Sequence, residues 1–187
     1  MSDAEGEFWG LSDDLVVEVG RLTIMGTTLE EMVYKIAGDV GLGWLPAGDG
    51  GQRRSRDLPA TDIAGRVRKR MLVPDPLLVE LDRSKVAAWC LDVVTALQQR
   101  HEVVHSMHYL RPSKDDPERW EHVRRPNRGP RKRPRREVDV TVADTREVRE
   151  LLERRVSEAF KLWIAMSDDP TPEALDMWAR PGADAER

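Results

Sequence analysis

The chain has 187 residues, a formal net charge of −4, and 34% charged against 40% apolar residues, as expected for one globular domain. No apolar run approaches the roughly 18 residues that cross a membrane, and the acidic N-terminus lacks an apolar signal-peptide core. We therefore expect a cytoplasmic protein without a membrane partner. A single cysteine, Cys90, excludes an internal disulfide framework, and its apolar neighbours indicate a packing thiol.

The spacing of apolar residues predicts four helices. The first spans residues 13–40, begins after Ser12 as its N-cap and ends at Gly41. Residues 43–60 are rich in glycine and proline and predict a loop. Further helices are expected over 61–72, 84–108 and 144–167, and one or two more helical turns over 172–179, before a tail.

Charge is unevenly distributed along the chain. Residues 100–136 hold 12 Lys or Arg against 5 Asp or Glu, so the remainder is strongly acidic. A basic segment on an acidic body indicates a localised anionic partner, and clustered Lys and Arg favour nucleic acid because they release counterions from closely spaced phosphates. A solvated basic loop explains the same pattern without a partner. The candidate RNA-binding residues are Arg124, Arg125, Arg128, Arg131, Lys132, Arg133, Arg135 and Arg136.

Two short runs flank the densest basic stretch, at residues 120–123 and 137–142. Both alternate in polarity and predict the two strands of a hairpin with the basic stretch at its tip. The predicted elements give an all-α fold: a helical bundle over residues 11–167, with a basic hairpin or loop inserted at 110–142 before the last long helix. Residues 168–187 are expected to form a short C-terminal helix and a tail.

The stretch R-H-E-V-V-H-S-M-H at residues 100–108 lies on the last turns of the third predicted helix. Arg100 and His105 are residue types suited to metal-free RNA cleavage, because histidine transfers protons near neutral pH and an arginine fork can hold phosphate oxygens as charge builds up. Five residues apart, the two side chains lie about 140° apart around a helix. They would therefore converge poorly in one chain, whereas two copies of the motif could meet in the groove of a two-fold dimer.

Two other interpretations of the same stretch stand beside this one. His101, Glu102 and His105 spell H-E-x-x-H, a zinc-hydrolase pattern in which two histidines one turn apart bind the metal and the glutamate is the base. A third ligand is not evident, since His108 would lie on the same helix and crowd the other two. In the inert interpretation, Arg100 pairs with Glu102, His101 packs in the core, and His105 lies favourably at a helix C-terminus.

The segment Q-R-H-E-V-V-H-S resembles the signature of the HEPN superfamily (higher eukaryotes and prokaryotes nucleotide-binding domains), in which arginine precedes a polar residue and, a few residues later, a histidine. Arg100, His101 and His105 match this signature, and the helix order over residues 11–167 is similar to the family's bundle. Toxin-type members carry a tyrosine two residues after the histidine, where this chain has Met107. The resemblance implies a homodimeric ribonuclease that uses no metal or cofactor, acts as a toxin or defence effector, and has an antitoxin or regulatory partner.

Three functional hypotheses result. The first is an endoribonuclease with Arg100 and His105 as catalytic residues, His101 in support, and RNA as the substrate. The second is a non-catalytic helical module that binds nucleic acid through its basic segment. The third is a zinc metallohydrolase built on His101, Glu102 and His105.

Overall fold

A computed structural model of the chain describes residues 12–47, 50–74, 82–116, 118, 120–126, 138–139 and 141–166. Four α-helices lie within them: α1 (Asp13–Asp39), α2 (Ala60–Leu72), α3 (Arg83–Val104) and α4 (Val142–Met166). The mostly helical fold expected from the sequence is thereby confirmed, as are the expected positions of the first, second and last helices. None of the described helices is long and apolar enough to span a membrane.

The strands belong to two small antiparallel sheets. The first is a hairpin between α1 and α2, made of β1 (Trp44–Pro46) and β2 (Gln52–Arg54) and followed by the 3-10 turn η2 (Ser55–Asp57). The second, with strand order β3-β4-β5, is made of β3 (Ser106–Pro112), β4 (Trp120–Pro126) and β5 (Val138–Asp139).

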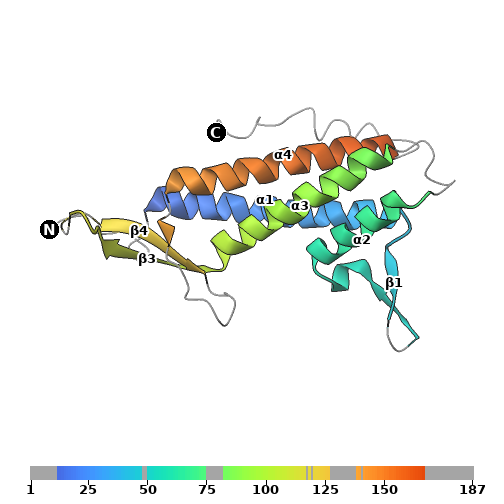
Figure 1. Ribbon diagram of the computed structural model, residues 1–187, viewed down its shortest axis with the longest axis horizontal. Helices are drawn as coiled ribbons and strands as arrows, with labels where there is room; N and C mark the ends of the chain where they lie inside the picture. Colours follow the sequence, from blue (N-terminus) through green and yellow to red (C-terminus); the bar gives the residue numbers. More distant parts are fainter. Residues whose placement is uncertain are drawn as a thin grey trace.

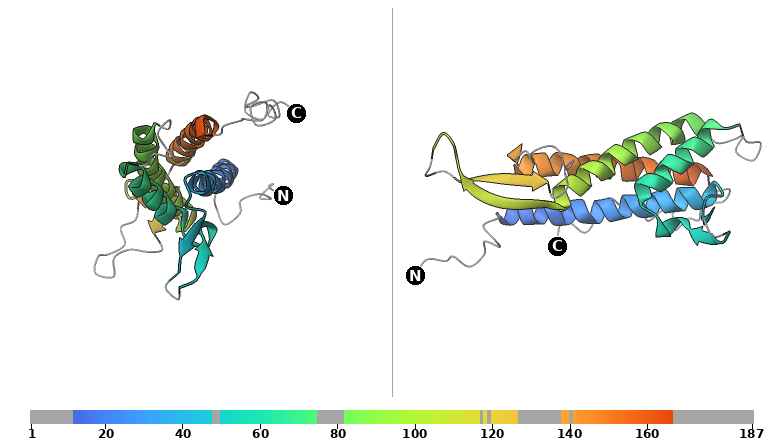
Figure 2. Two further views of the ribbon diagram at one scale, coloured as in Figure 1. Left: turned by 90° about the vertical axis from the view of Figure 1, so that its right-hand side faces the viewer. Right: turned by 60° about the horizontal axis from the view of Figure 1, so that its bottom comes forward.

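Helices α1 and α4 run side by side along the long axis, and α3 packs obliquely against them (Figure 1). The shorter α2 packs mainly against α3 and also contacts α1. Strands β3 and β4 extend from one end of this body, whereas the β1–β2 hairpin lies beside α2 toward the opposite end (Figure 1 and Figure 2). The two hairpins are thus separated along the length of the bundle.

Local hydrogen bonds explain where the helices begin and end. At the start of α1 the Ser12 hydroxyl accepts from the Leu15 amide at 3.4 Å. At its end Gly41 takes a positive φ of 77°, and Leu42 N–H donates to the Ala37 carbonyl at 2.7 Å in a Schellman motif. At the start of α4, Thr141 and Asp144 exchange hydrogen bonds as a capping box.

The core is one apolar cluster to which all four helices contribute. Cys90 is 1% exposed within it, and burial raises the pKa of its thiol to about 12, which confirms its role as a packing residue. The Trp89 indole lies beside it and donates to the Arg155 carbonyl at 3.0 Å, joining α3 to α4. The largest fully buried side chains are Leu15, Leu22, Leu29, Met32, Ile36, Ile63, Leu152, Val33, Val67, Val86, Val93 and Val103.

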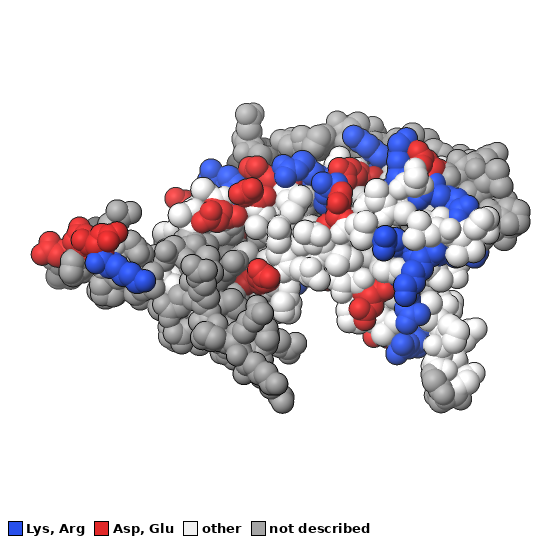
Figure 3. Space-filling view, viewed as in Figure 1, with Lys and Arg blue, Asp and Glu red and all other residues white. Residues whose placement is uncertain are grey.

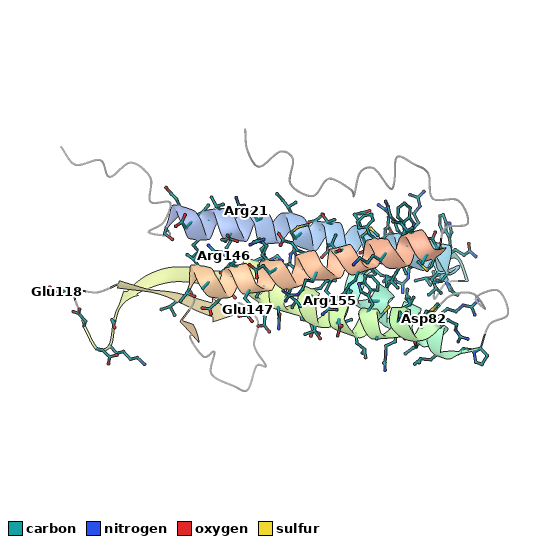
Figure 4. The ribbon with its side chains drawn as sticks, turned by 90° about the horizontal axis from the view of Figure 1, so that it is seen from above. Arg21, Asp82, Glu118, Arg146, Glu147 and Arg155 are labelled. Atoms are coloured by element: carbon teal, nitrogen blue, oxygen red, sulfur yellow. The ribbon has the colours of Figure 1, made fainter. Side chains whose placement is uncertain are left out.

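One carboxylate lies inside the contact between α1 and α4. Glu18 is 5% exposed, and its two oxygens accept from Arg149 Nε at 2.8 Å and Arg146 Nε at 3.4 Å. Arg21 lies 3.7 Å from the same carboxylate, and Figure 4 shows Arg21 and Arg146 on these neighbouring helices. Burial alone would raise the pKa of Glu18, but the hydrogen bonds and charges of the two α4 arginines outweigh it and lower the pKa.

Two sequence predictions about local structure are wrong. Residues 43–60 are not a loop throughout, because they hold the β1–β2 hairpin and η2, with Leu45 buried in the core. The third predicted helix, 84–108, ends at Val104, and His108 lies on β3 instead. The strand is favoured there because residues 106–112 pair along their whole length with β4.

The hairpin expected from residues 120–123 and 137–142 is present as the pairing of β4 with β5, but β3 adds a third strand on the other side of β4. The expected turns over 172–179 lie outside the described residues. So do six of the eight candidate RNA-binding residues, namely Arg128, Arg131, Lys132, Arg133, Arg135 and Arg136.

Replacing Glu18 with glutamine is expected to destabilise the fold. The amide keeps the shape of the side chain but removes the charge that pairs with Arg149 and Arg146, and losing a hydrogen bond to a charged group typically costs about 1.5–3 kcal/mol. Because folding lowers the pKa of Glu18, the contribution is present above the ordinary glutamate pKa of about 4.3 and is lost as the pH falls through the lowered value.

Denaturant unfolding of the wild-type and Glu18→Gln proteins from neutral to acid pH measures this effect. The difference in their free energies of unfolding should shrink as the solution is acidified. A difference that is the same at every pH would contradict the assignment of the stabilisation to the Glu18 carboxylate.

Candidate functional site

The Arg100–His105 motif lies at the C-terminal end of α3. His105 is the C-cap of the helix, and its N–H donates to the His101 carbonyl at 3.0 Å. The next residue, Ser106, donates its hydroxyl to the Glu102 carbonyl and begins β3. The motif therefore spans the junction between a core helix and a strand. Its last residue, His105, is hydrogen-bonded to α3 on one side and followed by β3 on the other.

Arg100 packs inward against α1. Its side chain is 15% exposed, and its Nη1 lies 3.9 Å from a carboxylate oxygen of Glu30. The arginine fits because α1 has a glycine at this point: a Cβ on Gly26 would lie 2.8 Å from Arg100 Nε and 3.0 Å from its Cγ. Arg100 Nε itself is buried with no hydrogen-bond partner among the described residues. The partner of Arg100 is thus Glu30, and not Glu102 as in the inert interpretation.

The histidines of the motif lie on the outside of the molecule. His101 and His105 are both exposed, and their ring centroids are 4.4 Å apart at an interplanar angle of 45°. The expectation that His101 packs in the core is wrong, because the buried face of this part of α3 is formed by Leu97 and Val103. The structure thus places the two imidazoles together, while the Arg100 side chain packs on α1.

A groove of about 590 Å³ runs along the inner side of the motif. Arg100, His101 and Glu102 line it from α3, and Glu30 and Tyr34 line it from α1. The first residues of α2 form the remaining side, where the free backbone N–H groups of a helix N-terminus favour an anion. A phosphate in this groove would meet Arg100 and His101, and the carboxylates of Glu30 and Glu102 on the same lining would oppose it.

The register of β3 with β4 brings the first residues of the densest basic stretch, residues 124–136, to the end of α3 that carries the motif. Ser106, the residue after His105, is paired with Pro126 at the end of β4. Arg125 and Arg124 on β4 are register partners of Met107 and His108 on β3. The chain therefore enters the densest part of the basic segment beside the C-terminal end of α3.

Few of the described side chains that could bind a metal lie close together. No group of three or more His, Cys, Asp or Glu side chains comes close enough to hold an ion in the part of the chain that the structure describes. His108 does not continue the helical row of His101 and His105, because it lies on β3. Glu102, the base of the zinc pattern, is exposed.

Sequence analysis missed two residues that position Arg100. Gly26 lies on the buried face of α1 and has no side chain, and the sequence pattern assigns no role to Glu30. A glycine inside a strong helical pattern costs about 1 kcal/mol relative to alanine, so its presence is a signal of close packing. Which side chain fills the space is decided by the crossing of α1 and α3 and cannot be found from either helix alone.

No protein-family model, no curated protein and no solved structure matches this chain.

Two alanine substitutions in α1 are expected to differ because of Arg100. Gly20→Ala should raise stability by about 0.5–1 kcal/mol through helix propensity, since Gly20 is exposed with nothing within 4 Å of its absent Cβ. Gly26→Ala should gain less or lose stability, because Arg100 must move away. Denaturant midpoints of the two variants provide the comparison, and equal stabilisation would show that Arg100 does not depend on Gly26.

Proposed function

We propose that this protein is a HEPN-like, metal-independent endoribonuclease that acts as a homodimer. The RNA 2′-oxygen attacks the adjacent phosphorus, the bond to the 5′-oxygen breaks, and the products are a 2′,3′-cyclic phosphate and a 5′-hydroxyl. His105 takes the proton of the 2′-hydroxyl and returns a proton to the departing 5′-oxygen, and Arg100 holds the non-bridging oxygens as their charge increases. His101, with its ring beside that of His105, is the supporting polar group.

The observation that carries the proposal is the meeting of the motif with the basic segment. Residues that can transfer protons and hold phosphate lie at the end of α3, and the register of β3 with β4 brings Arg124, Arg125 and the start of the basic run to the same end. A nuclease needs both features together, because the chemistry must take place where the RNA backbone is held. A solvated loop has no such requirement on its position.

The placement of the two principal side chains supports a dimer. Arg100 packs toward α1 and lines the groove, whereas His105 lies exposed at the helix end. If a two-fold axis passes next to the ends of α3, Arg100 of one subunit would lie opposite His105 of the other. The Arg100 side chain would then exchange its contact with Glu30 for one with phosphate.

The second candidate function is a nucleic-acid-binding module without catalysis. The observation that favours it is the resting position of Arg100, which is largely buried and paired with Glu30. If Arg100 keeps that position when RNA binds, it acts as a packing residue and the basic segment alone makes the contact with RNA.

Substitutions in the motif separate these functions. Arg100→Ala and His105→Ala should each reduce RNA cleavage by about 10²–10⁴-fold, the usual loss when a positioned acid, base or charge is removed. Glu102→Ala should cleave nearly as well as wild type, because the RNA mechanism gives this side chain no role. Each assay is run with and without chelator, where the RNA mechanism predicts equal wild-type activity, and alongside melting curves that verify the fold.

Two results would contradict the ribonuclease mechanism. One is an inactive Glu102→Ala protein with an unchanged melting temperature. The other is stoichiometric zinc in the purified protein that is lost on His101→Ala or His105→Ala. Both would favour the zinc hydrolase, in which Glu102 is the base and the two histidines are ligands.

The basic segment should supply affinity without sequence preference. Changing Arg131, Lys132, Arg133, Arg135 and Arg136 to serine should weaken RNA binding for all sequences and flatten its salt dependence, since each lost single-strand phosphate contact removes about 0.7 from the log–log slope. Titrations of labelled RNA over a salt series measure the slope. A slope equal to that of wild type would mean that these residues do not contact RNA.

A further inference from the structure

A second concentration of positive charge lies on the described part of the chain, away from the 100–136 segment. Residues 50–72 hold seven Arg or Lys and only two Asp. They form β2, η2 and α2, and Figure 3 shows Lys and Arg side chains gathered over this corner of the molecule. Arg53, Arg66 and Lys69 are exposed and make no ion pair among the described residues.

An exposed tryptophan accompanies this charge. Trp44 is 56% exposed although the next residue, Leu45, is buried in the core. Trp44 is the cross-strand partner of Arg54, whose guanidinium lies 5.4 Å from the centroid of the indole ring. An indole held in place by a hairpin and accompanied by arginine, but not covered by the core, is a stacking platform for a planar ligand.

We propose that the surface formed by the β1–β2 hairpin and the exposed side of α2, here called the hairpin–α2 surface, binds single-stranded RNA. A base stacks on Trp44, and Arg53 and Arg54 contact the phosphates beside it. Arg66 and Lys69 on α2 extend the positive surface for the neighbouring nucleotides. Stacking and phosphate contacts are the two interactions by which proteins hold single strands without reading their sequence.

The position of this surface relative to the candidate site favours RNA as its ligand. Tyr34 lines the groove that contains Arg100 and His101, and the Arg56 guanidinium lies 5.9 Å from the Tyr34 ring centroid. Arg56 lies on η2, two residues after Arg54 at the end of β2. An RNA strand leaving the groove at Tyr34 would meet Arg56, which is paired with Glu31 at 2.7 Å, and Arg54 and Trp44 lie on the hairpin just before it in the chain. The inference rests on the proposed function for the groove, while the binding surface itself can be tested separately.

An acidic protein would also be attracted to the positive charge, but it would have no need of the exposed indole. A duplex would satisfy the arginines, yet its bases are stacked inside the helix and are not available to Trp44. The combination of Trp44 with Arg53 and Arg54 is thus better matched to a single strand than to either alternative.

The test measures binding of the full-length protein to a labelled, single-stranded oligouridine with 2′-O-methyl groups, which lacks the attacking hydroxyl and stays intact. The variants are Trp44→Ala and the double variant Arg53→Ser/Arg54→Ser. The matched control is Arg154→Ser/Lys161→Ser, which removes two exposed charges from α4 instead. Unlabelled polyglutamate and duplex DNA serve as competitors, and melting curves verify the fold of each variant.

Trp44→Ala should weaken binding about tenfold, the effect of losing one stacked base, and the double variant should lower the salt slope by about 1.4, the effect of losing two phosphate contacts. The control should bind like wild type. The inference is overturned if wild type binds and both variants match the control, or if polyglutamate or duplex DNA displaces the labelled oligonucleotide as well as an unlabelled copy of it does. RNA cleavage by wild type would in that case leave the proposed function standing, whereas a wild type that neither binds nor cleaves RNA refutes both.

Discussion

The packing of α1 against the other helices is the constraint on which the rest of the structure depends. Its apolar stripe contributes the largest share of fully buried side chains, and α4 lies along it over most of its length. Two of the buried positions of α1 carry no apolar side chain. At Glu18 a buried carboxylate is held by two arginines of α4, and at Gly26 the absence of a side chain lets Arg100 of α3 approach. Both set the alignment of α1 with a neighbouring helix more narrowly than apolar contact alone would.

This alignment also decides the geometry of the candidate site. Because Arg100 is accommodated at Gly26, its guanidinium lies near Glu30 and the groove, while His101 and His105 remain outside. Among the described residues, Arg100 has one ion pair, at 3.9 Å, and an arginine so held can be transferred to a phosphate at a smaller cost than one in a fully satisfied network. The site is therefore compatible with two states of Arg100: a resting state in which it packs on α1 beside Glu30, and an RNA-bound state in which it contacts the phosphate.

The helices were predictable from the sequence because each carries an apolar stripe of helical period and recognisable caps such as Ser12 and Gly41. The strands were not. β1 and β2 have three residues each, too few for a period to be seen, and β3 directly follows a helix whose apolar pattern continues into Met107 and Leu110. What ends the helix at His105 is pairing with β4, a partner some fifteen residues further along the chain. Glu18 was unpredictable for a related reason, since its arginine partners lie on the last helix.

The candidate residues themselves were found from the sequence, since the spacing of Arg100, His101 and His105 is a local property. Their surroundings were not, because Gly26, Glu30 and the start of α2 are brought to the motif only by tertiary packing. The same holds for Trp44 and Arg54, which were assigned to a loop and become a pair only through the register of the hairpin. Residue types indicate a chemistry, but the fold decides which of them can act together.

The central claim is that Arg100 of one subunit acts with His105 of the other. Mixing the inactive Arg100→Ala and His105→Ala proteins under conditions that let subunits exchange tests it directly. A mixed dimer would hold one site with both side chains intact and one with neither, so an equal mixture should regain about a quarter of the wild-type cleavage rate, because half of the dimers are mixed. A mixture that exchanges subunits but stays as inactive as its components would contradict the composite site.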